Sequence, residues 1–116
     1  MNIQIFGRSK SFDTDKAKRF FKERKIAFQY IDLAEKGFSK GELTKIAAAV
    51  GGLDALIDPK TKAQDAYLVY QHMRGEHRFQ KALDNPALFM APVVRDGARA
   101  TVGYKPDVWL AWLAGT

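Results

Sequence analysis

The sequence predicts an α/β fold in which a mixed four-stranded sheet is flanked by helices. Three observations lead to this prediction. A strand, a helix and a second strand follow one another in roughly the first quarter of the chain, an order typical of parallel pairing with a right-handed crossover. Helical segments fill the middle of the chain as an insertion. A β-hairpin and a last helix then close it.

The βαβ unit rests on two alternating segments and one amphipathic segment. Apolar and polar residues alternate from Asn2 to Phe6 and again from Ile26 to Ile31, which predicts two strands, the first of them central in the sheet. Between them, Asp15 to Lys25 predicts a helix capped by Asp13 and Thr14. Its apolar stripe consists of Ala17, Phe20 and Phe21 and lies under a basic face.

The middle of the chain is predicted to be helical. Ser39 to Val50 is the clearest helix, because Ser39 and Glu42 have the spacing of a capping box and Gly51 follows the last apolar residue. The other helical segments are Leu53 to Ile57, Lys62 to Met73, His77 to Leu83 and a short turn from Asn85. Within Lys62 to Met73, we expect Ala66, Val69, Tyr70 and Met73 to share one side of the helix.

The last part of the chain predicts a hairpin and a helix. Pro92 to Arg95 and Arg99 to Val102 are strand-like, and Asp96-Gly97 between them is a strong two-residue turn. Pro106 is well placed to begin the last helix, whose Trp109 and Trp112 we assign to the core. The whole order is that of the thioredoxin-like fold. No linker, repeat or low-complexity segment divides it, which predicts one domain over residues 1–116.

Composition excludes several classes of chemistry. The chain has no cysteine, so disulfides, thiolate metal sites, iron–sulfur clusters and thiol redox chemistry are absent from it as given. Two histidines are too few for a convincing zinc centre, and we expect neither a metal nor a cofactor. No apolar run approaches the about 18 residues of a membrane span, and the start lacks a secretory leader. These features predict a soluble cytoplasmic protein.

The net charge of +6 is concentrated in one early segment. The segment from Arg8 to Lys25 contains eight basic residues and only three acidic ones. Within it, Lys18, Lys22 and Lys25 are spaced to share a helix face. Such a patch is either a docking surface for an acidic protein or nucleic acid, or a solvated helix face. No recognition-helix signature supports direct DNA binding, which rests on charge alone.

Several motifs together resemble the arsenate reductase (ArsC)/Spx family over nearly the whole chain. The opening I-Q-I-F-G-R-S-K-S-F-D-T-D-K-A-K-R-F-F is similar to the family's first strand, active loop and first helix, with matches at Phe6 and the Lys16-Ala17 pair. Ile57 to Lys62 resembles the family's basic segment. Asn85-Pro86 ahead of Ala91-Pro92, and the Val102-Gly103-Tyr104 closing motif, continue the resemblance.

The sequence also departs from the family's pattern. Where the family has its reactive cysteine, this chain has Ser11, and Thr14 stands at the second cysteine of Spx-type members. Ala91 replaces the arginine before the proline, and Lys60 corresponds to the other anion-binding arginine of the reductases. A serine hydroxyl cannot replace a thiolate, because its pKa is far higher and its oxygen forms no reducible disulfide.

Two functional hypotheses follow. The first is a redox-silent protein-binding or regulatory module; the resemblance to Spx implies an acidic partner surface such as the RNA polymerase α C-terminal domain, docked through Lys18, Lys22 and Lys25. The second is a glutathione- or thioredoxin-dependent oxidoreductase whose active-site cysteine is replaced by Ser11.

The candidate site residues each have a second interpretation. Ser11 marks the catalytic position or is a helix cap, and Lys60 binds an anion or is a solvated lysine. Arg8, Lys10 and Pro92 complete the candidate anion- or ligand-binding set, and the resemblance implies a cis peptide bond before Pro92. A triad of Ser11 with His72 or His77 lacks the G-x-S-x-G elbow of serine hydrolases.

Overall fold

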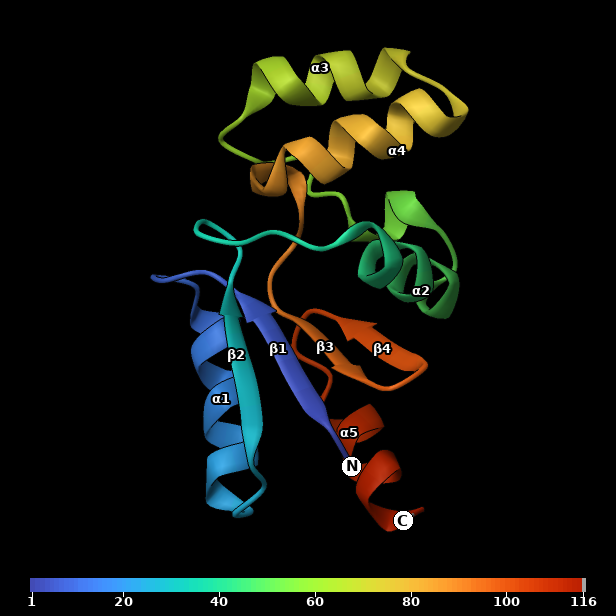
Figure 1. Ribbon diagram of the computed structural model, residues 1–116. Helices are drawn as coiled ribbons and strands as arrows, with labels where there is room; N and C mark the ends of the chain where they lie inside the picture. Colours follow the sequence, from blue (N-terminus) through green and yellow to red (C-terminus); the bar gives the residue numbers. More distant parts are fainter. Residues whose placement is uncertain (116) are drawn as a thin grey trace.

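The computed structural model describes residues 1–115; Thr116, the last residue of the predicted domain, lies outside the described residues. The elements follow the predicted order (Figure 1). They are β1 (Ile3–Gly7), α1 (Phe12–Glu23), β2 (Phe28–Asp32), α2 (Lys40–Val50), the 3₁₀ helix η1 (Leu53–Leu56), α3 (Gln64–His72), α4 (Gly75–Asp84), the 3₁₀ helix η2 (Pro86–Leu88), β3 (Val93–Asp96), β4 (Arg99–Val102) and α5 (Pro106–Ala114).

The predicted mixed four-stranded sheet is confirmed, with strand order β2-β1-β3-β4 and β1 inside it. β1 runs parallel to β2, β3 runs antiparallel to β1, and β4 runs antiparallel to β3. The predicted hairpin turn is one residue too early, because Asp96 belongs to β3 and pairs with Arg99. Gly97 and Ala98 form the turn instead. Gly97 has a φ of 62°, which suits the first position of a tight hairpin.

Each face of the sheet buries its own apolar cluster. Ile3, Ile5 and Val94 point to the face covered by α1 and α5, where the buried helix residues are Ala17, Phe20, Phe21, Trp109 and Trp112. Phe6, Ile31 and Val93 point to the opposite face, which is covered by α2. The alternation along β1 and the core positions of both tryptophans are therefore as predicted.

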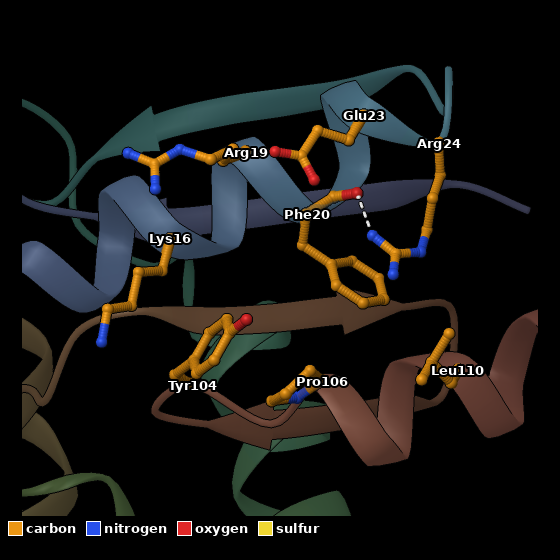
Figure 2. Close-up of a pocket in the computed structure, with 8 residues that line it drawn as sticks. All are labelled: Lys16, Arg19, Phe20, Glu23, Arg24, Tyr104, Pro106 and Leu110. Atoms are coloured by element: carbon orange, nitrogen blue, oxygen red, sulfur yellow. Dashed lines mark hydrogen bonds between the residues drawn. The ribbon is translucent and has the colours of Figure 1, made fainter.

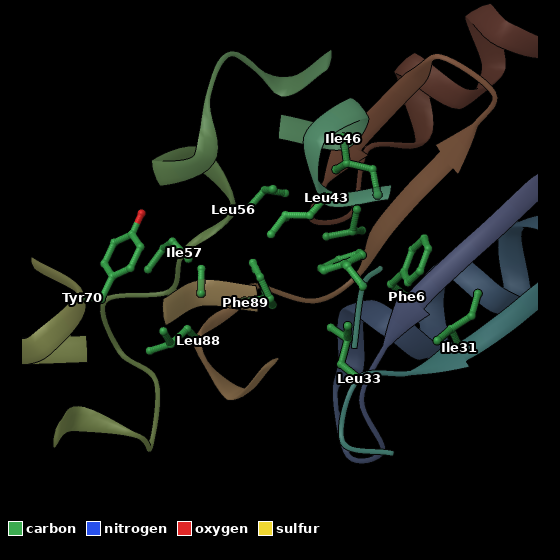
Figure 3. Close-up of a cluster of buried hydrophobic side chains, with 13 residues drawn as sticks. Phe6, Ile31, Leu33, Leu43, Ile46, Leu56, Ile57, Tyr70, Leu88 and Phe89 are labelled. Atoms are coloured by element: carbon green, nitrogen blue, oxygen red, sulfur yellow. The ribbon is translucent and has the colours of Figure 1, made fainter. Parts of the chain in front are cut away.

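The cluster on the α2 side extends beyond the sheet. It continues from Phe6 through η1 and Phe89 to Tyr70 on α3 (Figure 3). α3 and α4 stack on each other away from the strands (Figure 1). Their outer attachment is polar: the Tyr70 hydroxyl donates a hydrogen bond to Asp54 of η1, and Arg78 of α4 binds the same carboxylate at 2.9 Å.

Some helix predictions need correction. α1 begins at Phe12 and ends at Glu23, so Asp13 and Thr14 lie inside it and Lys25 lies beyond it. α4 begins at Gly75 rather than His77. The amphipathic pattern identified each helix, but it does not locate ends, because flanking polar residues satisfy helical and turn geometry equally well.

Candidate functional site

The candidate site begins where β1 ends and α1 starts. Gly7 closes β1, and a Cβ atom at this position would lie 2.4 Å from the Cγ2 atom of buried Thr14. Glycine is therefore required for the first turn of α1 to pack against the strand. The backbone N–H of Arg8 donates to the Thr14 hydroxyl at 3.4 Å. The loop from Arg8 to Ser11 is thus held close to the strand end.

Ser11 is the N-cap of α1. Its Oγ atom accepts a hydrogen bond from the backbone N–H of Thr14 at 3.2 Å, and its carbonyl accepts one from Asp15 at 3.1 Å. The helix-cap interpretation of Ser11 is confirmed, and the prediction that Asp13 and Thr14 cap the helix is wrong. Serine in an extended conformation directly before the helix offers its hydroxyl to the third residue, which an acid inside the first turn cannot do.

Arg8 connects the loop to the segment before β3. Its guanidinium donates hydrogen bonds to the carbonyl oxygens of Pro86 and Phe89. Partial burial lowers the pKa of the Arg8 guanidinium, while the carboxylates of Asp58 and Asp32 act in the opposite direction. The arginine keeps its charge at neutral pH, so these are charge-assisted bonds that tie two distant segments together.

Pro92 follows the segment that Arg8 holds. The Ala91-Pro92 peptide bond is cis, as the resemblance implied. Because Phe6 pairs with Val93 in the antiparallel register, the buried Pro92 comes level with Gly7, at the end of β1 that leads to α1. The carbonyl of Pro92 accepts a hydrogen bond from Gly103 at 2.8 Å. The proline therefore lies beside the start of the candidate loop.

A pocket of about 330 Å³ brings Arg8 and Lys60 together. Asp58 and Lys62 also line it, and the backbone N–H of Lys60 donates to the Asp58 carboxylate at 2.8 Å. Ser11, Lys10 and Pro92 are not among its lining residues. Lys10 is exposed and has a φ of 65°. The predicted anion-binding residues therefore lie around the same end of the sheet, but only two of them share a pocket.

The three lysines predicted to share a helix face are separated in the structure. Lys18 lies over the ring of Tyr30 on β2, with 3.6 Å from Nζ to the ring centroid. Lys22 is exposed one turn later on α1. Lys25 lies beyond the helix end with a φ of 57°, so it does not continue this face. The helix stops early because the backbone N–H groups of Arg24 and Lys25 donate to the carbonyls of Phe21 and Lys22, which closes its last turn.

The side of α1 that faces α5 holds a basic groove that the sequence pattern did not predict. Lys16, Arg19 and Arg24 line it together with Tyr104 and Leu110 from the far end of the chain (Figure 2). The spacing of the basic residues was visible in the sequence. The pairing of α1 with the segment around Tyr104 requires the fold, because more than half of the chain separates the two.

The site offers little for metal or hydrolytic chemistry. Within residues 1–115, no group of three or more histidine, cysteine, aspartate or glutamate side chains is placed to hold a metal ion. His72 and His77 are exposed on α3 and α4, outside the loop that contains Ser11. Over the same residues, no helix is long and apolar enough to cross a membrane.

Comparison with known proteins by sequence gives no match. No protein-family model matches the chain, and no curated protein matches it.

Solved structures, in contrast, match over almost the full length. An ArsC family related protein from Bacteroides fragilis superposes with a TM-score of 0.81 and 18% identity, covering 96% of this chain and 97% of that one. An arsenate reductase from Vibrio cholerae has a TM-score of 0.80 and 21% identity, with coverage of 96% and 97%. An ArsC-related protein from Brucella melitensis has a TM-score of 0.64 and 18% identity, with coverage of 97% and 95%. The chain therefore has the thioredoxin-like fold of the ArsC arsenate reductases and ArsC-related proteins, without a cysteine.

Proposed function

We propose that this protein is a redox-silent relative of the ArsC/Spx proteins that acts by binding another protein. The observation that carries the proposal is that the basic residues of α1 and its flanks have no carboxylate partner among the described residues. The basic residues of this segment are Lys16, Lys18, Arg19, Lys22, Arg24 and Lys25. Within residues 1–115, none of them forms an ion pair with a carboxylate of the chain. Their charge is thus available to an acidic partner.

The loop that precedes α1 supports the redox-silent part of the proposal. Arsenate reduction requires a thiolate, and the chain has no cysteine. The Ser11 hydroxyl caps α1, and the Arg8 guanidinium bonds the carbonyls of Pro86 and Phe89. Both side chains hold the fold together. We expect no arsenate reduction above a buffer control with glutathione or thioredoxin, and turnover there would contradict the proposal.

The binding part is tested by quantitative co-purification. The RNA polymerase α C-terminal domain is the first partner to test, because the resemblance to Spx implies it. The wild-type chain is compared with a variant in which every basic residue of α1 and its flanks is changed to glutamine. We expect a saturable complex with the wild type, weakened by added salt and lost in the variant. Equal recovery with both proteins would contradict a function through this segment.

The alternative is an oxidoreductase whose cysteine is replaced. One observation favours it: Ser11 lies at the N-terminus of a twelve-residue helix, in the same loop as Arg8 and Lys10. Ser11→Cys should therefore produce a thiol with a pKa below the ordinary value of about 8.5, measured by the pH dependence of iodoacetamide alkylation. Glutathione-dependent turnover by Ser11→Cys would favour the oxidoreductase. A lowered thiol pKa without turnover would favour the binding module.

A further inference from the structure

A groove of about 180 Å³ separates α1 from the start of α5 (Figure 2). Lys16, Arg19 and Arg24 line it from the side of α1. Tyr104, Pro106 and Leu110 line it from the opposite side, where Tyr104 is 37% exposed and Leu110 is 44% exposed. The groove thus combines cations on one wall with apolar and aromatic surface on the other.

The cations of this wall have no carboxylate partner among the described residues. Among residues 1–115, the ion pairs are Arg78 with Asp54 and Arg99 with Asp96, so all three cations of the groove are without a carboxylate within 4.0 Å. Arg24 is nevertheless held in place. Its guanidinium stacks on the ring of Phe20 at 3.8 Å and donates to the Phe20 carbonyl at 3.0 Å. An arginine fixed in this way loses little conformational entropy when it binds a carboxylate.

The aromatic wall is also rigid. Tyr104 packs edge-on against buried Trp109, with 5.5 Å between ring centroids. Lys16 lies 5.6 Å from the centroid of the Tyr104 ring. Pro106 forms the first turn of α5 and fixes the backbone there. A ligand therefore meets a preformed surface at this position.

The size of the groove indicates what occupies it. Pockets for small molecules usually enclose about 300–1,000 Å³, so a volume of about 180 Å³ is small for a free ligand. It suits one side chain of a larger partner that contacts the rim as well. The rim is basic, so the residues flanking that side chain should be acidic.

Glu23 distinguishes two classes of polyanionic partner, a nucleic acid and an acidic peptide. This carboxylate belongs to the last residue of α1 and also lines the groove (Figure 2). A phosphate backbone would be repelled by it and has no donor to offer it. A peptide has backbone N–H groups that can donate to the carboxylate while its own acidic side chains bind the cations. The groove therefore favours a peptide over a nucleic acid.

We propose that the groove between α1 and α5 binds an acidic peptide segment of a partner protein. The segment inserts one aromatic or aliphatic side chain between Tyr104 and Leu110, and its flanking carboxylates bind Lys16, Arg19 and Arg24. This inference rests on the proposed protein-binding function and deepens it, since it assigns the contact to the groove residues of α1 rather than to Lys18 and Lys22, which do not line the groove.

The test uses a synthetic fluorescent peptide in which one phenylalanine is flanked by glutamates. Its binding to the full chain is measured by fluorescence anisotropy at several salt concentrations. The groove variant is Lys16→Glu with Arg19→Glu. Its matched control is Lys18→Glu with Lys22→Glu, which changes the net charge equally at residues of the same helix that do not line the groove.

We expect the groove variant to weaken peptide binding about tenfold and the control variant less than about twofold. Replacing the central phenylalanine of the peptide by serine should weaken binding several-fold, because the apolar contact is lost. Equal loss in the two variants would show attraction by overall charge alone and would overturn the inference. No binding to the wild type would overturn it as well.

Two further outcomes separate this inference from other possibilities. A labelled single-stranded oligonucleotide is tested in the same way. If it binds more tightly than the peptide and its binding is lost in the groove variant, the ligand of the groove is a nucleic acid and the inference is overturned. The proposed function is contradicted by a different result, namely that co-purification of the partner does not depend on any of the basic residues of α1 and its flanks. If the partner is lost only with the Lys18 and Lys22 substitutions, the proposed function survives and the groove assignment is overturned.

Discussion

The two faces of the sheet are covered by layers that are held in different ways. On one face, Phe21 of α1 packs against Trp109 of α5 with 5.3 Å between ring centroids, and the surrounding contacts are almost entirely apolar. One buried hydrogen bond, from the Trp109 indole to Thr101, supports this layer at 2.8 Å. On the other face, the apolar cluster extends outward to α3 and α4, where Tyr70, Asp54 and Arg78 form its polar end.

This difference follows from distance to the sheet. α1 and α5 lie directly on the strands, so burial of apolar surface contributes most to holding them there. α3 and α4 lie beyond the strands and have little sheet surface to cover (Figure 1). Directional bonds at Arg8 and Tyr70 therefore set the position of the outer segment. We expect the layer of α1 and α5 to unfold only with the whole molecule, while the outer helices open locally first.

The largest effect should come from the apolar layer. Trp109 is fully buried and contacts three aromatic rings. Trp109→Ala should lower the free energy of unfolding by about 3–5 kcal/mol, because it leaves a cavity between α1 and the sheet. Urea denaturation followed by far-UV circular dichroism measures this loss. Leu110→Ala, at a 44% exposed site on the same helix, is the control and should cost far less. Similar losses in both variants would contradict the assignment.

The second effect concerns Arg8. Arg8→Ala removes the charge-assisted hydrogen bonds to Pro86 and Phe89, and should cost about 2 kcal/mol of stability. Hydrogen exchange should increase most in η2 and α4. Lys10→Ala, in the same loop but exposed, serves as the control. A loss below about 0.5 kcal/mol would show that Arg8 does not hold the outer layer, and would leave it free for an anion.

A smaller effect is expected at the outer polar contact. Tyr70→Phe removes only the hydroxyl that donates to Asp54. The Asp54 side chain is 72% exposed and keeps Arg78, so the cost should be about 1 kcal/mol. Native-state hydrogen exchange should show faster opening of α3 and α4, with α1 unchanged. Faster exchange in α1 as well would mean that the two layers are coupled.

Tyr70→Phe should also change how the free energy of unfolding depends on pH. Burial raises the pKa of Tyr70 to about 12, and its hydrogen bond to Asp54 acts in the same direction. The folded protein thus holds this proton more tightly than the unfolded chain, whose tyrosines have pKa values of about 10. The stability contributed by Tyr70 is complete below about pH 10 and is lost as the pH rises through about 12. Tyr70→Phe should lack this part of the alkaline loss of stability, measured by urea denaturation at each pH.

The smallest effect should come from the surface lysines. Lys18→Glu with Lys22→Glu changes no residue of either apolar cluster and should change the stability by less than about 1 kcal/mol, since the contact of Lys18 with Tyr30 is half-exposed. A thermal melt should place Tm close to that of the wild type. A large drop in Tm would show that the Lys18 contact with β2 contributes to the fold.

The sequence determined the order of elements and both apolar faces of β1. Alternation from Asn2 to Phe6 and the capping box at Ser39 specify local structure directly, because each pattern has a physical period or a paired hydrogen bond. The absence of cysteine likewise excludes thiol chemistry by a side chain of this chain. The resemblance to ArsC and Spx implied the cis bond before Pro92, which the structure contains.

Only the tertiary structure decided what the polar side chains of the candidate site contact. Arg8 was predicted to bind an anion, yet its guanidinium meets carbonyls about 80 residues away, a contact that no local pattern encodes. Lys25 does not share a helix face with Lys18 and Lys22, because α1 ends before it. The basic groove forms because α5 lies beside α1. Long flexible cations form contacts wherever the fold brings an acceptor within reach, so their roles depend on packing between distant segments rather than on spacing along the chain.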